Sequence, residues 1–304
     1  MSKREKMLYL LNNKELMIEI EKVFKTSYSG YGEIKDKEVA VFIYYMTLYC
    51  MNKILDEKTI NKTTGSIVSD SQVKKGLNFD NTIAAMTALN DRYTFEFSEY
   101  LKYLLKEKCI VSFIFVASAV GHEIFHIYQR QNIENNVISI ESLTDSLEFI
   151  SRMQDESFYD RNYNELHFEI TAELAGIYLS ISFIEEIIGR KLNTNELDYI
   201  KYLFVDNNSK NLHKFDTEES TISYLNSLID NVKDYVKLNP DLLTKFPVIQ
   251  TIFDKNGNLR CTDDILSVGS TLIDFNISTE KDLTEYFTII LKSFKQNTKE
   301  YYKK

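Results

Sequence analysis

The sequence predicts a mainly helical chain with a small antiparallel β-sheet, which is an α+β fold. Helix-breaking residues are scarce, because the 304 residues include only nine glycines and two prolines. One short segment, residues 92–98, alternates large and polar side chains as a half-buried strand does. Hydrophobic residues make up 44% of the chain, which is enough for one large core or two modest ones.

The N-terminal part of the chain supplies two predicted helices and the predicted strands. Apolar residues gather on one side of residues 2–25, and a second, strongly apolar helix is predicted over residues 36–57. A polar stretch follows, in which residues 66–68 predict a short strand. The period-two alternation of residues 92–98 predicts a longer strand with one buried face.

The rest of the chain is predicted to be helical, apart from one hairpin. Residues 119–128 contain no proline and predict a buried helix. A later helix begins near residue 164 and ends at Gly189, because a glycine there can cap it. Further helices are predicted at residues 139–152, 194–204, 216–237, 262–273 and 279–300, and a hairpin at residues 248–261.

The motif with chemical content is His-Glu-x-x-His, formed by His122, Glu123 and His126 within the predicted buried helix. Residues four apart lie one helical turn apart on the same face, so both imidazoles can bind one metal ion. Glu123 then projects beside them toward a metal-bound water, as a general base does. The alternative is a pair of core histidines, but a buried glutamate between them is costly without a cation.

Small residues predict that the motif helix meets the helix that begins near residue 164. Gly121, directly before the first histidine, costs a helix about 1 kcal/mol relative to alanine, which predicts a close approach at this point. Gly176 lies on the glutamate-bearing face of the second helix and would permit such an approach. The contact matters because a catalytic zinc needs a third protein ligand and an open position for water.

Three glutamates, Glu165, Glu169 and Glu173, share one stripe of the second helix, and Glu169 is predicted as the third ligand. Ala172 marks the crowded part of this face and favours Glu169 and Glu173 over Glu165, which is too near the helix start. Choosing Glu169 leaves an acid four residues later that can orient a ligating imidazole.

These motifs resemble those of the gluzincin metallopeptidases. In that family His-Glu-x-x-His is followed on a later helix by a glutamate ligand and, four residues on, by an acid that supports a ligating histidine. The resemblance covers about residues 92–185. It implies a zincin-like fold, a Zn²⁺ cofactor bound by His122, His126 and Glu169, Glu123 as the general base, and Glu173 as the supporting acid.

The resemblance also bears on substrate binding. In zincin folds a strand upstream of the motif helix edges the cleft, so Tyr93–Phe97 would bind an extended peptide by strand addition. An ordinary core strand is an equally good interpretation of this segment. The chain is predicted to divide into a zincin-like catalytic domain, residues 1–190, and a C-terminal helical part, residues 191–304, that packs on it.

More than one side chain could contact the transition state. Family members supply a tyrosine or histidine from outside the motif helices, and Tyr159, Tyr163 and His167 are the candidates here. His167 precedes Glu169 by two residues, about 200° around a helix, so both cannot face one ion. A packing role is the alternative for His167, and a plain surface charge is the alternative for Glu173.

Composition restricts the partners and the compartment. The net charge of −9 argues against a non-specific nucleic-acid surface, which needs clustered lysine and arginine. The apolar stretches 39–51 and 110–120 are shorter than the roughly 20 residues of a transmembrane helix, so no membrane partner is expected. The charged N-terminus is not followed by a signal-peptide core, and three widely spaced cysteines fit reduced thiols. A cytoplasmic protein, with the residue bias of an AT-rich bacterial or phage genome, is expected.

The sequence therefore predicts a zinc metallopeptidase that hydrolyses peptide bonds of an intracellular protein or peptide. One alternative is a catalytically silent zinc-binding regulatory or interaction protein with the same fold. Another is a zinc hydrolase of a non-peptide amide. The intact Glu123 favours an enzyme, because a structural zinc site needs no general base.

Overall fold

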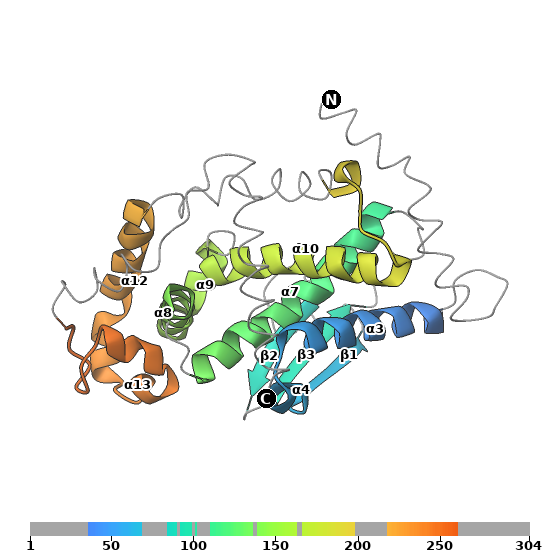
Figure 1. Cartoon of the computed structure of the whole chain (residues 1–304). Coiled ribbons are helices and arrows are strands. Elements are labelled where there is room, and N and C mark those ends of the chain that lie inside the picture. Colours follow the sequence, from blue (N-terminus) through green and yellow to red (C-terminus); the bar gives the residue numbers. More distant parts are fainter. Residues whose placement is uncertain are drawn as a thin grey trace. The chain divides into compact units, whose positions relative to one another are not determined.

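The structure is a computed structural model that describes residues 36–68, 84–89, 92–98, 101, 110–135, 139–162, 166–197 and 218–260 (Figure 1). The helices in chain order are α3 (Asp36–Ile54), α4 (Glu57–Ile60), α7 (Ile110–Glu134), α8 (Ile140–Gln154), α9 (Glu156–Asn162), α10 (His167–Ile188), α12 (Glu218–Leu238), α13 (Leu242–Lys245) and the 3-10 helix η3 (Pro247–Thr251). The strands are β1 (Thr63–Val68), β2 (Ala84–Leu89) and β3 (Arg92–Ser98). This part of the chain is mostly helical with one small sheet, as predicted.

Several predicted features fall outside the described residues. These are the helices at 2–25, 262–273 and 279–300, most of the helix at 194–204, and the side chains of Cys109 and Cys261. The third cysteine, Cys50, is a buried free thiol on α3.

The sheet is mixed, which corrects the prediction of an antiparallel sheet. Its strand order is β1-β3-β2, with β1 parallel to β3 and β2 antiparallel to β3. A parallel pair needs a long connection, and residues 69–91 between β1 and β3 provide one. That connection contains β2, which the sequence did not predict, because its residues Ala-Ala-Met-Thr-Ala-Leu lack a period-two alternation of large and polar side chains.

The central strand β3 has the bounds that the alternation predicted, and Tyr93, Phe95 and Phe97 are buried. Both backbone edges of β3 are paired, one with β1 and the other with β2. Strand addition requires an unpaired edge. The prediction that Tyr93–Phe97 binds a peptide by strand addition is therefore wrong, and the alternative of a core strand is correct.

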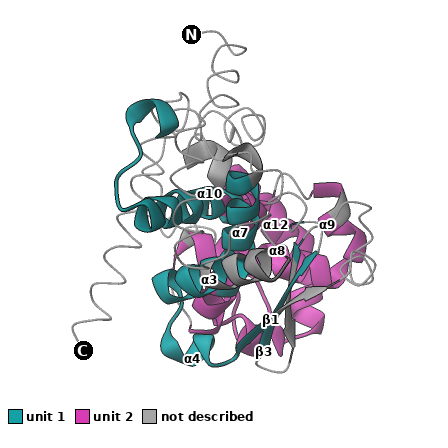
Figure 2. Ribbon diagram, turned by 90° about the vertical axis from the view of Figure 1, so that its right-hand side faces the viewer, with its two compact units in different colours: residues 1–127, 172–204, 297–304 teal, residues 128–171, 205–296 magenta. Residues whose placement is uncertain are grey.

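The chain forms two compact units, each assembled from separate stretches (Figure 2). Unit 1 comprises residues 1–127, 172–204 and 297–304, and unit 2 comprises residues 128–171 and 205–296. The divisions after residues 127 and 171 fall inside α7 and α10, so both helices contribute to both units. The predicted boundary between residues 190 and 191 differs from this division and stays a prediction.

Unit 1 contains the sheet, α3 and the crossing parts of α7 and α10. The rings of Tyr49 on α3 and Phe183 on α10 lie 5.3 Å apart. Gly189 ends α10 with a φ of 71°, and its N–H donates to the carbonyl of Glu185, as predicted for a glycine cap. In the described residues, no helix has both the length and the apolar character that crossing a membrane requires.

Unit 2 has its own hydrophobic core between α8, α12, α13 and η3. Its buried residues are Ile133, Leu143, Leu147, Ile150, Leu225, Leu228, Ile229, Val232, Val236, Leu242, Leu243, Phe246, Val248, Ile249, Ile252 and Phe253. The helices predicted at 139–152 and 216–237 are confirmed as α8 and α12. The hairpin predicted at 248–261 is wrong for its first strand, because residues 247–251 form η3 and only an isolated bridge joins Phe253 to Leu259.

Candidate metal centre

The motif residues lie on α7, a 25-residue helix, as the sequence predicted. Val116, Ala117, Val120 and Ile124 are fully buried, because the apolar run before and within the motif faces the core. Glu123 and His126 are each only 8% exposed.

Two glycines let α7 and α10 cross in backbone contact. A Cβ added at Gly121 would lie 2.9 Å from Cα of Gly176. A Cβ added at Gly176 would lie 2.5 Å from the carbonyl oxygen of Ser118 and 3.0 Å from the amide nitrogen of His122. Real Cβ atoms essentially never come within 3.0 Å of such neighbours. The close approach predicted at Gly121 is therefore confirmed.

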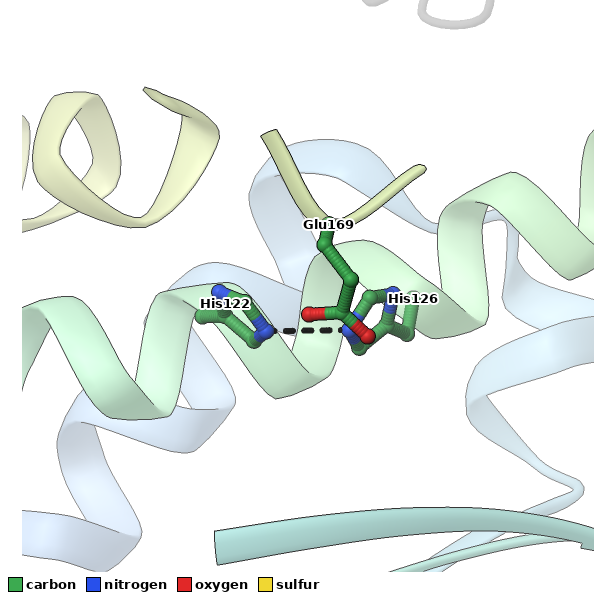
Figure 3. Close-up of side chains that lie close together, drawn as sticks. All are labelled: His122, His126 and Glu169. Carbon is green, nitrogen blue, oxygen red and sulfur yellow. Dashed lines mark hydrogen bonds between the residues drawn. The ribbon is translucent and has the colours of Figure 1, made fainter. Parts of the chain in front are cut away.

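His122 and His126 present their Nε2 atoms to each other at a distance of 3.0 Å, and the carboxylate of Glu169 lies beside them (Figure 3). One ligand atom from each of these three side chains lies within 4.8 Å of the other two. Zinc–nitrogen distances of about 2.0–2.1 Å at a tetrahedral angle place two ligand nitrogens about 3.3 Å apart. The separation of the imidazole nitrogens therefore suits a shared metal ion.

The chemistry of the three donors agrees with this geometry. Glu169 is 5% exposed, so its carboxylate is largely removed from water, and His126 is buried as well. Two imidazoles and a carboxylate form a donor set that divalent transition metals prefer. In the part of the chain that the structure describes, His122, His126 and Glu169 can hold a metal ion.

Glu173 lies one turn after Glu169 on α10, with its side chain 39% exposed. Its Oε2 atom is 3.5 Å from Nδ1 of His122, which is the ring nitrogen that faces away from His126. This distance is longer than a hydrogen bond but short enough for an electrostatic interaction with the ring. The structure thus brings the predicted supporting acid close to the imidazole of His122.

The three candidates for transition-state contact have different surroundings. The hydroxyl of Tyr159, on α9, donates a hydrogen bond of 2.5 Å to Oε1 of Glu169. His167 instead lies 2.9 Å from Oδ1 of Asp145 through its Nδ1 atom. Tyr163 lies outside the described residues. Of the candidates that the structure describes, Tyr159 contacts the metal group and His167 contacts α8.

A buried carboxylate of α8 holds the start of α10, which carries Glu169 in its first turn. The backbone N–H groups of His167 and Phe168 donate to the two oxygens of Glu148, at 2.7 and 3.1 Å. The hydroxyl of Tyr224 on α12 donates to Glu148 at 2.6 Å. Glu148 therefore acts as a helix cap supplied from another helix, because it satisfies N–H groups that have no partner within α10.

Burial and neighbouring charges together set the protonation of Glu148 and His167. Burial raises the pKa of Glu148 to about 7, although nearby His167 and the Tyr224 hydroxyl act in the opposite direction. Burial alone would lower the pKa of His167, but the hydrogen bond and charge of Asp145, together with the charges of Glu148 and Glu141, outweigh it and raise this pKa to about 9. A protonated His167 between Asp145 and Glu148 offsets part of their buried negative charge.

Gln129 fixes α10 to α7 one turn beyond the motif. Its Nε2 atom donates to the carbonyl oxygen of Phe168 and to Oγ1 of Thr171, both at 2.9 Å. The glutamine is buried, so these bonds are shielded from competing water. The residues that they hold flank Glu169 in the chain.

Sequence reasoning missed Gln129, Asp145, Glu148 and Tyr224. One signal was present: Asp145 and Glu148 stand close to Leu143 and Leu147 in the sequence of α8. Acidic residues are almost never fully buried unless they are paired, so their place among leucines indicated buried partners. Their partners could not be inferred, because Tyr224 lies 76 residues from Glu148 in the sequence.

Comparison of the chain with known protein families, with curated proteins and with solved structures gives no match. The function is accordingly inferred from the geometry of these side chains.

Proposed function

We propose that the protein is a zinc-dependent metallopeptidase of the gluzincin type, with a zincin-like catalytic region, that cleaves a cytoplasmic protein or peptide. The observation that carries this proposal is the convergence of His122, His126 and Glu169, with Glu123 next to the first histidine on the same helix. Two histidines and one glutamate are the ligand set of catalytic zinc sites that keep a position open for water.

In this proposal His122, His126 and Glu169 hold the metal, and Glu173 orients the ring of His122. The chemistry that bound zinc supplies is polarisation of a carbonyl and a lowered pKa of water. Glu123 accepts the proton that water loses when it attacks the scissile carbonyl, and it returns a proton to the leaving amine. The shielded position of Glu123 suits this role, because a closed site limits the loss of protons to bulk water.

The test separates metal binding from catalysis. The purified protein should contain about one zinc per chain and should cleave members of a mixed peptide library, as followed by mass spectrometry. Glu123→Gln should keep the zinc and lose cleavage by several orders of magnitude, because Glu123 moves protons and is not a ligand. Glu134→Gln is the matched control, since Glu134 is an exposed glutamate at the end of the same helix.

Three results would count against the proposal in different ways. A wild-type protein that binds no metal would remove the site. A Glu123→Gln protein that binds no metal would make Glu123 a ligand rather than a base. A zinc-loaded wild-type protein that cleaves no peptide, while Glu123→Gln also keeps its zinc, would favour the silent zinc-binding protein.

A further inference from the structure

The second oxygen of the Glu169 carboxylate has a defined partner. Tyr159 donates to Oε1 of Glu169 at 2.5 Å, a distance typical of a hydroxyl that is bonded to an ionised carboxylate. Such charge-assisted bonds are about twice as strong as bonds between neutral groups. The bond therefore restricts the rotation of the Glu169 carboxylate and with it the way the two oxygens are presented to a cation.

The ring of Tyr159 is held from two sides. The guanidinium carbon of Arg152 lies 4.4 Å from the ring centroid, a cation–π contact. The ring of Phe168 stacks against Tyr159 with centroids 5.9 Å apart, and Phe168 in turn stacks on Phe149 at 5.1 Å. The hydroxyl is thus positioned by packing within α8, α9 and α10.

We infer that Tyr159 is a positioning residue that reserves Oε1 of Glu169, so that the carboxylate binds its metal through one oxygen only. The inference rests on the proposed function. A metal centre that activates water needs an open coordination position, and a carboxylate that binds through both oxygens reduces the room for it. Hydrogen bonds to ligating carboxylates are a common means of fixing how they bind.

The assignment differs from the transition-state role that the sequence suggested for Tyr159. A group that stabilises a transition state must direct its hydrogen bond at the reacting atoms. The Tyr159 hydroxyl directs its bond at a ligand. The effect of removing it should therefore be visible in the metal centre itself, without any substrate.

The test uses Co²⁺ as the probe, because its visible absorption reports the coordination number. The full-length Tyr159→Phe protein should bind Co²⁺ with a visible band weaker than that of the wild type, as expected when coordination expands, and with roughly 10-fold lower affinity. Tyr235→Phe is the matched control, since Tyr235 lies on α12 and its ring packs against the core of unit 2. The control should leave the Co²⁺ spectrum unchanged.

A second variant covers the case in which Tyr159→Phe does not fold. Arg152→Gln keeps the hydroxyl but removes the cation over its ring, and it should weaken the Co²⁺ band in the same direction by a smaller amount. A folded Tyr159→Phe protein with the wild-type spectrum would overturn the inference. A wild-type protein that binds neither Co²⁺ nor Zn²⁺ would instead overturn the proposed function, so the two failures are distinguishable.

Discussion

At the scale of single residues, Glu169 has the greatest influence on the metal group. It is the member that comes from α10, it is buried, and its carboxylate also accepts the Tyr159 hydroxyl. His122 and His126 are four residues apart on one helix, so they stay close together whatever α10 does. The third donor is the one that must be brought to them.

Glu169→Ala should therefore release the metal, because two imidazoles alone bind zinc weakly. Glu173→Ala should weaken zinc binding by roughly 10- to 100-fold without abolishing it, since in the proposed site Glu173 supports a ligand and is not one itself. Dialysis against a mild chelator followed by metal analysis measures both effects. Glu186→Ala, an exposed glutamate of α10, is the control. Retention of stoichiometric zinc by Glu169→Ala, with loss from Glu173→Ala, would reverse the two roles.

At the scale of elements, the crossing of α7 and α10 is set by Gly121 and Gly176. Gly176→Ala gains about 1 kcal/mol of helix propensity. The added Cβ would lie 2.5 Å from a backbone oxygen that cannot move alone, and such overpacking typically costs about 1–3 kcal/mol. We expect the variant to be less stable than the wild type in urea unfolding, and its zinc affinity to fall because the helices separate.

The control for this prediction is Gly189→Ala at the end of α10. No atom lies within 4 Å of a Cβ added there, so its cost arises only from the φ of 71°. It should lower stability by roughly 1 kcal/mol and leave zinc affinity unchanged. Equal or higher stability of Gly176→Ala would show that the crossing can relax.

The start of α10 gives a prediction on pH. The pKa of His167 is raised in the folded protein from 6.5 to about 9, and that of Glu148 from 4.5 to about 7. A group whose pKa is higher in the folded than in the unfolded protein stabilises the fold fully at pH values below its unfolded pKa. This contribution is lost as the pH rises through its folded pKa. The free energy of unfolding of the metal-free protein should therefore fall between about pH 5 and pH 9.

Urea unfolding at several pH values in the presence of a chelator measures this dependence. The loss assigned to His167 is on the order of 3 kcal/mol, because each pKa unit corresponds to about 1.4 kcal/mol. Glu148→Gln should reduce the pH dependence of the free energy of unfolding in the lower part of this pH range. His167→Gln should reduce it in the upper part. A wild-type profile that rises with pH over this range would contradict the protonated state of His167.

At the scale of the whole molecule, bound metal should stabilise the fold by mass action. At free zinc 100-fold above the dissociation constant, the gain is about 2.7 kcal/mol for one site. The midpoint temperature of thermal unfolding of the wild type should rise when zinc is added and return to its starting value with a chelator. The Glu169→Ala protein should show no zinc-dependent change in this temperature. Equal shifts in both proteins would place zinc binding elsewhere in the chain.

Local sequence patterns predicted those parts of the molecule that depend on neighbours in the chain. The bounds of β3, the motif helix and the glycine cap at Gly189 follow from such patterns. The parallel pairing of β1 with β3 and the contact of Tyr224 with Glu148 do not, because they join distant segments. The place of Glu169 beside the two histidines was predictable, because two small residues near it, Ala172 and Gly176, marked the face where the helices meet.

The glycine crossing has a consequence for how this site tolerates change over evolution. At Gly121 and Gly176 the close approach of two helices is limited by main-chain atoms rather than by side chains. Core side chains of the two units can then change in size and shape over evolution while the distance between the two helices stays the same. The two glycines thus set the distance between the helices that carry the ligands. Divergent sequences could keep the same metal geometry as long as both positions remain glycine.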